Sequence, residues 1–394
     1  MTVQFLIVGG GIGGLAAALA LGQRGHSIEL FEQAEVFSEV GAGVQLSPNV
    51  TRRLRSLGVG AAIDRVAARP ASIVVRRAAD GARIISAPQA DRLERRYGAP
   101  YVCIHRADLH NTLLEAVRTL KNINLNTGVH VDTISARNSA VCAATSGVCA
   151  WEGDALIGAD GVWGRVRSRM INNAQAPHYT GHTAWRALAP MDTLPSALRS
   201  TDVQVWLGPK LHAVAYPVRA GQALNLVVIA ESPPLGDVRN WDQAANAAAL
   251  HQAIGAHNAG IMPLIEAMPS WRTWSLNGRA PVAGPREMAQ GRIALVGDAA
   301  HPMVPYLAQG AGMAIEDAVA LAAAVDATHT GRSTLPEALQ DYAQARWQRN
   351  AQVQAHAWRN GQIYHAQGVT RLGRDLSLRL LGERLLDMPW LYAG

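Results

Sequence analysis

The chain has 394 residues, of which 49% are hydrophobic and 17% charged, with a formal net charge of +6. These values describe a folded protein of two interleaved domains plus a tail, and they exclude a disordered chain. No apolar run approaches the length of a membrane span, there is no room for a signal peptide before the first strand, and the arginine clusters lack interleaved aromatic residues. We therefore expect neither a membrane nor a nucleic-acid partner. Cys103, Cys142 and Cys149 are odd in number and lack metal-ligand spacing, which favours reduced thiols in the cytoplasm and no metal site.

The N-terminal segment predicts a dinucleotide-binding unit. A short apolar strand leads into Gly9-x-Gly11-x-x-Gly14, an apolar helix follows, and a second strand ends at Glu32. The glycines allow a tight turn and let a pyrophosphate approach the helix N-terminus, whose partial positive charge favours an anion. Glu32 is placed to bind a ribose diol, and an acid at this position suits FAD or NAD rather than NADP.

The middle of the chain predicts an antiparallel sheet. Two strands are expected around the Asp80-Gly81 turn, and four more follow between residues 180 and 230. The turns among these four are expected at Gly208-Pro209 and Ala220-Gly221, and residues 242–268 are expected to be helical.

Two further acidic turns follow predicted strands. Asp160-Gly161 lies within GADGVWGRVR, and Gly297-Asp298 follows an apolar strand near residue 295. After a proline-containing loop, Gln309-Gly310-Ala311-Gly312 opens a long alanine-rich helix. An acidic turn beside a bare helix N-terminus can hold a ribityl hydroxyl and the anionic edge of a ring.

Together these three motifs resemble the single-component (group A) flavin-dependent aromatic hydroxylases, which include para-hydroxybenzoate and salicylate hydroxylases. The resemblance covers essentially the whole chain. It implies an α/β fold in which a Rossmann-like FAD-binding domain is interleaved with an antiparallel-sheet substrate domain and followed by a C-terminal helical region. On this basis we assign residues 1–70, 98–170 and 280–330 to the FAD-binding domain, 71–97 and 171–279 to the substrate domain, and 331–394 to the helices.

The resemblance also implies the cofactors and the reaction. FAD would be tightly bound, NADH or NADPH would visit without a Rossmann domain of its own, and oxygen from O2 would reach a phenolic ring through a flavin C4a-hydroperoxide. Asp298 would bind ribityl or pyrophosphate oxygens, Arg106 would lie near the flavin diphosphate, and the loop that contains Gly41 and Gly43 would move to let the flavin meet its reductant. The expected cofactor residues are Gly9, Gly11, Gly13, Gly14, Glu32, Gly43, Val44, Arg106, Asp160, Asp298, Pro305, Gly310, Ala311 and Gly312.

His212 and Tyr216 are the candidate catalytic residues. Alternation along a strand puts them on one face, and the resembling hydroxylases share this His-x-x-x-Tyr spacing. Ionising a phenol of pKa ~10 near neutral pH costs roughly 4 kcal/mol, so the pocket must supply help. Histidine is the natural proton acceptor, and the tyrosine would hold or relay the phenolic oxygen. The alternative is that His212 simply faces solvent.

The substrate is expected to be a small phenolic carboxylate, which the net positive charge would attract. Hydroxynicotinate hydroxylases tend to carry His in place of Gln45, and some 3-hydroxybenzoate hydroxylases carry Gln in place of Pro305, so a salicylate-like substrate is the first interpretation. A 3-hydroxybenzoate 6-hydroxylase or a 6-hydroxynicotinate 3-monooxygenase is the alternative, followed by a halogenase, epoxidase or dehydrogenase of the same fold. A non-catalytic binder would need neither GADG nor GDAAHP. The protein is expected to be a monomer or a homodimer.

Overall fold

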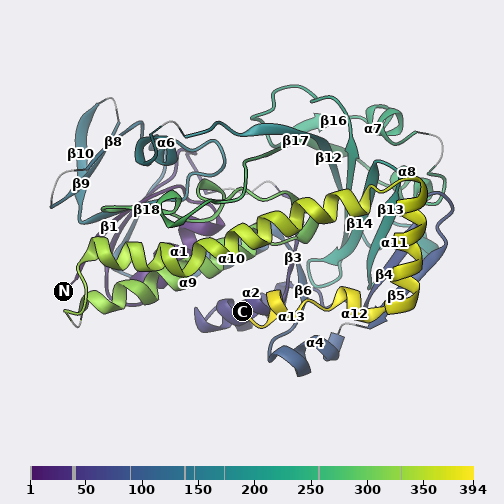
Figure 1. The fold of residues 1–394 in the computed structure, drawn as a ribbon, viewed down its shortest axis with the longest axis horizontal. Coiled ribbons are helices and arrows are strands. Elements are labelled where there is room, and N and C mark those ends of the chain that lie inside the picture. The colour runs from purple at the N-terminus through teal and green to yellow at the C-terminus, as the bar shows by residue number, and fades with distance from the viewer. Residues whose placement is uncertain are drawn as a thin grey trace.

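A mainly parallel sheet forms the centre of one half of the molecule in the computed structural model, which describes residues 2–37, 41–88, 90–136, 139–145, 147–172, 174–255, 258–329 and 331–394. Within these residues the sheet has six strands (Figure 1). Their order is β18 (Ala289–Gln290), β19 (Ile293–Leu295), β11 (Ala155–Gly158), β1 (Gln4–Val8), β2 (Ser27–Phe31) and β7 (Ile123–Asn126). The β18 strand runs antiparallel to its neighbour, and the others are parallel.

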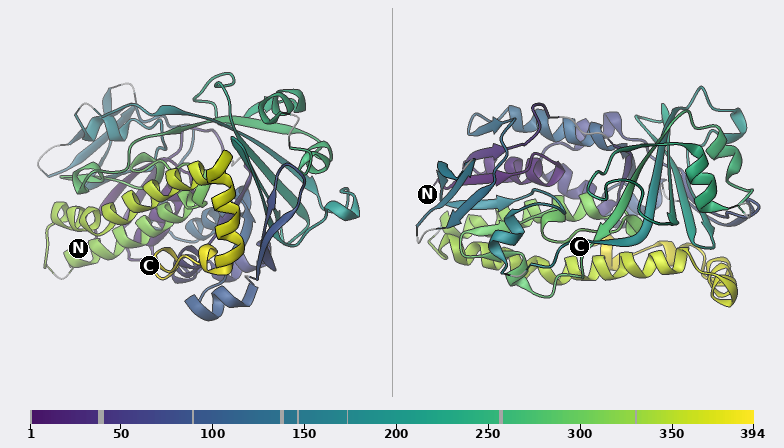
Figure 2. Two further views of the ribbon diagram at one scale, coloured as in Figure 1. Left: turned by 45° about the vertical axis from the view of Figure 1, so that its right-hand side comes forward. Right: turned by 90° about the horizontal axis from the view of Figure 1, so that it is seen from above.

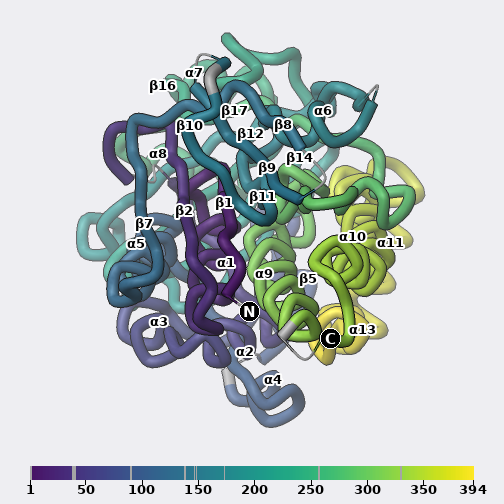
Figure 3. Tube along the Cα trace, turned by 90° about the vertical axis from the view of Figure 1, so that its left-hand side faces the viewer, coloured from purple at the N-terminus to yellow at the C-terminus, as the bar shows by residue number. Residues whose placement is uncertain are grey.

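Helices cover one face of this sheet and a small antiparallel sheet packs on the other, which explains its continuous apolar sequence. Phe5, Leu6 and Ile7 of β1 are fully buried, as expected of a parallel strand packed on two sides. The helix α1 (Ile12–Gly22) lies beside α9 (Gly310–His329), and α5 (Arg106–Arg118) packs against α1 (Figure 3). Small residues permit the close approach of α1 and α9, since a Cβ on Gly13 would lie 3.4 Å from the Cβ of Ala314.

The other half of the molecule is built on a mostly antiparallel sheet. Within the described residues this sheet has eight strands, and β13 and β4 form its one parallel pair. The expected turns at Asp80-Gly81, Gly208-Pro209 and Ala220-Gly221 connect neighbouring strands and are confirmed. In spatial order the strands are β16 (Gln243–Ala245), β17 (Trp271–Gly278), β12 (His178–Pro190), β15 (Ala223–Glu231), β14 (Leu211–Val218), β13 (Val203–Gly208), β4 (Ser72–Arg77) and β5 (Arg83–Pro88).

The remaining elements surround these two sheets. The expectation of a continuous helical region over 242–268 is wrong at its start, because β16 extends the large sheet before two short helices. The small sheets are β8 (Thr133–Ala136), β9 (Val141–Thr145) and β10 (Val148–Gly153), and β3 (Gly43–Leu46) with β6 (Val102–His105). The other helices are α2 (Pro48–Ser56), α3 (Gly60–Val66), α4 (Ala90–Tyr97), α6 (Val166–Met170), α7 (Ala247–Ile254), α8 (Met262–Glu266), α10 (Leu335–Tyr364), α11 (Gly368–Leu381), α12 (Glu383–Leu386) and α13 (Pro389–Tyr392).

The helix α10 joins the two halves. It has 30 residues and begins at a capping box in which Thr334 and Glu337 exchange hydrogen bonds. From there it runs along the α/β half and ends beside the large sheet (Figure 2). None of the described helices is both long and apolar enough to span a membrane.

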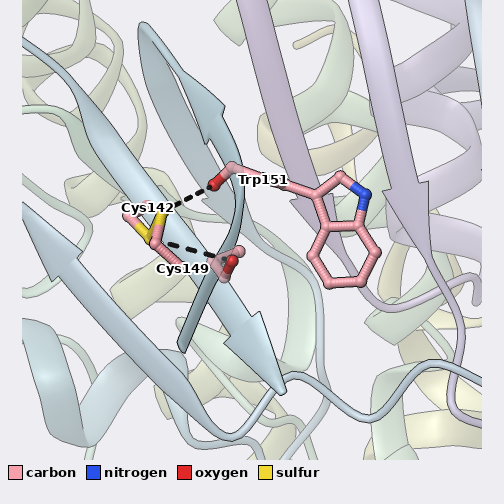
Figure 4. The surroundings of a disulfide bond; sticks show 4 residues. Cys142, Cys149 and Trp151 are labelled. Atoms are coloured by element: carbon pink, nitrogen blue, oxygen red, sulfur yellow. Dashed lines mark hydrogen bonds between the residues drawn. A yellow bond between two sulfur atoms is a disulfide. The ribbon is translucent and has the colours of Figure 1, made fainter. Parts of the chain in front are cut away.

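The cysteines depart from the expectation of reduced thiols. Cys142 on β9 and Cys149 on β10 form a disulfide across this hairpin, with their Cα atoms 5.8 Å apart (Figure 4). That spacing is within the range that a disulfide requires. The three cysteines are therefore one disulfide-bonded pair and the buried, free Cys103. The cysteines no longer support the prediction of a reducing compartment.

A buried ionic network links α9 and α10 to the Gly297 turn. Asp317 is fully buried and accepts hydrogen bonds from Arg346 Nε at 2.8 Å and from the Gly297 N–H at 3.2 Å. Its Oδ2 also lies 2.5 Å from His301 Nε2. Although burial alone would raise the pKa of Asp317, His301 and Arg346 hold it well below its usual range. The carboxylate is therefore charged and fully engaged.

We expect Asp317→Asn to lower the free energy of unfolding by about 3–5 kcal/mol, because the buried Arg346 then loses one of its two carboxylate partners. Urea unfolding of the purified protein measures this loss. The control is Glu115→Gln, which breaks the exposed pair between Glu115 and Arg118 and should change stability by less than about 1 kcal/mol. Equal effects of the two substitutions would contradict a stabilising role for the network.

Candidate active site

The three sequence motifs meet at one edge of the six-stranded sheet. The strands β19, β11, β1 and β2 are adjacent and parallel, so their carboxyl ends lie side by side. Asp298, Asp160, the glycine turn and Glu32 follow these four ends in that order. Ligands of open α/β sheets bind at this edge, and the strand order alone therefore brings together segments nearly three hundred residues apart.

The glycine turn is shaped for a pyrophosphate. A Cβ on Gly9 would lie 2.4 Å from the Ala159 carbonyl oxygen, and one on Gly14 would lie 1.9 Å from the Gly9 carbonyl oxygen. Side chains are therefore excluded where backbone meets backbone. A Cβ on Gly11, by contrast, would meet no described atom within 4 Å, so this position faces open space at the N-terminus of α1.

Glu32 is held in place by the turn that it follows. Its carboxylate accepts hydrogen bonds from the Gly10 N–H at 2.8 Å and the Ala34 N–H at 2.9 Å. Each oxygen keeps a second acceptor position, so the carboxylate can still bind two hydroxyls of a ribose. The predicted role thus fits the geometry.

Asp160 has a structural contact that the sequence did not indicate. Its Oδ2 accepts a hydrogen bond from the Val166 N–H at 2.9 Å, which holds the start of α6. A Cβ on Gly164 would lie 2.1 Å from the Asp160 carboxyl carbon, so the side chain folds over its own turn. Oδ1 is buried and has no hydrogen-bond partner among the described residues.

Asp298 faces a recess. Its side chain is accessible to water, yet protein surrounds it closely enough that desolvation raises its pKa, against the lowering effect of Arg106 and His301. Gly310, at the start of α9, is close by, since its Cβ would lie 4.0 Å from Asp298 Oδ1. An acceptor and a helix N-terminus therefore lie together, as the motif predicts.

The first turn of α9 presents free amides toward this recess. The Met313 N–H donates to the Gln309 carbonyl oxygen at 2.8 Å, so the amides of residues 310–312 precede the first bond of the helix. Gly310 and Ala311 are partly accessible, whereas a Cβ on Gly312 would lie 2.6 Å from Val50. Pro305 is exposed at the start of a single turn over Pro305–Leu307, before this helix.

Arg106 connects the cofactor edge to the large sheet. It begins α5, and a Cβ on Gly41 would lie 2.8 Å from its Cβ. Its guanidinium lies 5.2 Å from the ring centre of Trp241, and Arg186 lies 4.8 Å from the same ring. Both cations therefore contact the same indole ring. Trp241 was missed because it follows β15 in a segment without a recognisable motif.

Gly43 is fixed more firmly than a mobile loop would suggest. Its N–H donates to Asn225 Oδ1 at 2.7 Å, and its carbonyl oxygen accepts from the Tyr216 hydroxyl at 2.7 Å. A Cβ at this position would lie 2.4 Å from the Tyr216 ring. Gly43 and Val44 begin the strand β3, so movement of the expected loop would have to break these bonds, and residues 38–40 lie outside the described chain.

His212 and Tyr216 lie on the same buried face of β14, as predicted. Tyr216 packs in one core cluster while Ala213 and Ala215 pack in another. His212 is 2% exposed, so the solvent-facing alternative is wrong. The Tyr216 hydroxyl, however, donates to Gly43, which assigns it a contact between the domains in place of a free donor for a ligand.

An aromatic and histidine-rich shell surrounds His212. Its Nδ1 lies 2.9 Å from His365 Nε2, and its ring centre lies 5.3 Å from that of Tyr306 and 5.2 Å from that of Tyr364. Burial, with a smaller contribution from His365, lowers the pKa of His212 well below its usual value. His212 is therefore neutral at neutral pH. His365 was missed because it follows a long helix without any local motif.

These features fit FAD. The open position at Gly11, the anchored Glu32 carboxylate and the free amides of α9 match its pyrophosphate, ribose and isoalloxazine edge respectively. The surfaces are contributed by four adjacent strand ends and the N-termini of two helices, which is enough to bind an extended dinucleotide.

Comparisons with known proteins agree with this assignment. Residues 2–357 match the family described as FAD binding domain. A 3-hydroxybenzoate 6-hydroxylase from Polaromonas naphthalenivorans (strain CJ2) is 36% identical over 393 residues, covering 98% of this chain and 95% of the relative. The 3-amino-4-hydroxybenzoate 2-monooxygenase PtmB3 of Streptomyces platensis is 35% identical, covering 99% and 95%.

A solved salicylate hydroxylase substrate complex has the same fold, with a TM-score of 0.83 at 24% identity over 100% of this chain and 96% of that one. Structural likeness at this identity shows the fold, whereas the sequence relatives and the family match show the enzyme class. The chain therefore belongs to the FAD binding domain family, among its single-component flavin-dependent aromatic hydroxylases.

Proposed function

We propose that this enzyme hydroxylates the ring of a phenolic aromatic carboxylate, with NADH or NADPH as reductant and O2 as oxidant. The observation that carries the proposal is the position of His212. The neutral, buried His212 lies beside Tyr306. Tyr306 belongs to the loop that runs from Asp298 to the start of α9. Through Tyr306 this loop links His212 to the proposed flavin site, which supports His212 as the acceptor of the phenolic proton.

The proposed roles of the residues follow from their contacts. Residues 1–70, 98–170 and 280–330 would bind FAD, and residues 71–97 and 171–279 would cover the substrate. Bound FAD, once reduced, would supply the activated oxygen. The amides of α9 would stabilise the negative edge of the ring, and the large sheet would exclude water.

The choice of phenolic acid rests on the sequence relatives. Three of them are named 3-hydroxybenzoate 6-hydroxylase, and others are named 3-amino-4-hydroxybenzoate 2-monooxygenase. These names favour a benzoate with a hydroxyl meta or para to the carboxylate. Pro305, where some of the 3-hydroxybenzoate hydroxylases carry Gln, keeps salicylate in the panel.

Substrate screening tests the proposal. We expect 3-hydroxybenzoate or salicylate to stimulate NAD(P)H oxidation by the purified holoenzyme, with a hydroxylated product identified by mass spectrometry and little hydrogen peroxide. Benzoate, which lacks the phenol, is the matched control and should yield no hydroxylated product. Stimulated oxidation in which all oxygen is recovered as peroxide would contradict hydroxylation, and a halide-dependent product would favour the halogenase alternative.

Gly11→Val should purify with little flavin, because the added side chain would fill the open space proposed for the pyrophosphate. The ratio of flavin to protein absorbance measures this loss. Gly373→Val is a matched control, since Gly373 is also free of described atoms within 4 Å but lies on the exposed α11. Full occupancy in the Gly11 variant would mean that the pyrophosphate binds elsewhere.

His212→Ala should hydroxylate at least about tenfold more slowly at neutral pH, because it removes the proposed acceptor of the phenolic proton. The lowered pKa of His212 keeps the wild-type base neutral down to pH values well below 6.5. The hydroxylation rate of the wild type should therefore not fall near neutral pH through protonation of His212. The variant's rate should rise roughly tenfold per pH unit toward the phenol's pKa, since substrate ionisation then comes from solution.

The measurement is product formation in a single turnover, in which pre-reduced enzyme is mixed with O2 at pH 6.5 to 9. His178→Ala is the control, because His178 is exposed on β12, which β15 separates from the strand of His212. A defect in the His212 variant that stays constant with pH would remove His212 from the proton transfer.

A further inference from the structure

Beside His212 lies a second cluster of histidine and carboxylate side chains, which contacts the proposed base through His365. His182 on β12, Glu231 at the end of β15 and His365 just after α10 each offer one ligand atom, and these atoms lie within 4.8 Å of one another. His182 and Glu231 are direct partners in the β12–β15 register. Two neighbouring strands and one helix end therefore contribute to a single point.

The backbone holds this cluster together. The Lys210 N–H donates to the His365 carbonyl oxygen at 3.2 Å, and Arg374 Nη1 donates to the Tyr364 carbonyl oxygen at 2.7 Å. These bonds fix the end of α10 against β14 and α11. The rings of His182 and His365 lie with their centres 5.0 Å apart. The site therefore does not depend on a freely moving segment.

Two ring nitrogens in the cluster lack partners. Nδ1 of His365 and Nδ1 of His182 are both buried and make no hydrogen bond to any described residue, and His365 as a whole is 6% exposed. Buried polar atoms are nearly always satisfied in proteins, and an ion is one way to satisfy them. Burial also lowers the pKa of His182, and it lowers that of His365 to about 3, so both imidazoles are neutral. Neutral imidazole is the form that binds metals.

We propose that His182, Glu231 and His365 form a binding site for a divalent transition-metal ion of the zinc class. Two imidazoles and one carboxylate are a donor set that suits zinc, whereas calcium and magnesium prefer oxygen alone. Bonds of about 2.0–2.2 Å require ligand atoms roughly 3.4 Å apart, so the three side chains must draw together slightly. Glu231 Oε2 also lies 3.4 Å from Lys210 Nζ on the exposed side, so the ion and Lys210 would share this carboxylate.

The ion would act on His212 through His365, an effect that rests on the proposed function. If the metal binds Nδ1 of His365, the ring proton must lie on Nε2, which then donates to His212 Nδ1. His212 would carry its own proton on Nε2 and could not accept one from the phenol there. If the metal binds Nε2 instead, it replaces the contact with His212. Either geometry predicts that the metal inhibits hydroxylation.

Equilibrium dialysis of tag-free holoenzyme against zinc chloride, with metal analysis, tests the site itself. We expect one zinc per chain, with binding weakened at least about tenfold by His182→Gln and by Glu231→Gln. His178→Gln is the matched control, because it removes another histidine of β12 that is exposed and outside the cluster. His182 and Glu231 are more accessible than His365, so their substitution should disturb the fold less. Thermal unfolding without zinc shows whether the two variants remain folded.

Zinc should also raise the melting temperature of the wild-type holoenzyme and of the His178 variant more than that of the two cluster variants, because a ligand of the folded state stabilises it. Absence of stoichiometric zinc, or zinc binding that is equal in all four proteins, would overturn the site. These readouts need no turnover, so they stand even if the proposed reaction fails.

A rate measurement then tests whether zinc bound at this site inhibits hydroxylation. Single-turnover hydroxylation with and without zinc should slow in the wild type and much less in the cluster variants, each compared with its own zinc-free rate. Stoichiometric binding without inhibition would confirm the site and overturn its coupling to His212.

Discussion

The arrangement of the active site depends on the buried carboxylate of Asp317. It binds the Gly297 N–H, His301 and Arg346 at once, so it ties the turn that presents Asp298 to the long C-terminal helix. Glu316, its neighbour, pairs with Arg346 and Arg349 and accepts from Asn49 of α2. Because unpaired buried charges are costly, none of these segments can shift alone. The cofactor edge is therefore fixed through α10, which carries Arg346 and Arg349 and contributes no proposed cofactor residue itself.

A second set of contacts fixes the large sheet to this frame. Gly43 is held by Asn225 and Tyr216, which come from two neighbouring strands of that sheet. The turn of residues 305–307 packs against the same sheet face through Tyr306 and Leu307. Movement of the loop around Gly43 is consequently coupled to the sheet that carries His212.

Local motifs were predictable, and contacts between distant segments were not. The glycine turn, Asp298 and Glu32 could be assigned because each follows a strand end, where backbone geometry demands particular residue types. His365, Arg346 and Trp241 carry no such requirement in the sequence, since an arginine within a long helix is ordinary. The same limit explains Asp160 and Tyr216. Their residue types were consistent with ligand binding, but the structure gives them partners in α6 and β3.

Burial of His212 has two opposing consequences for the proposed proton transfer. Desolvation keeps the imidazole neutral and able to accept, yet the same desolvation weakens it as a base. It therefore cannot retain the phenolic proton, and the proton must move on. His365 lies 2.9 Å away, and its own pKa is lowered by burial, so it too can pass a proton but not store it. On the proposed function, the rate of hydroxylation depends less on the basicity of His212 than on the group that binds Nδ1 of His365.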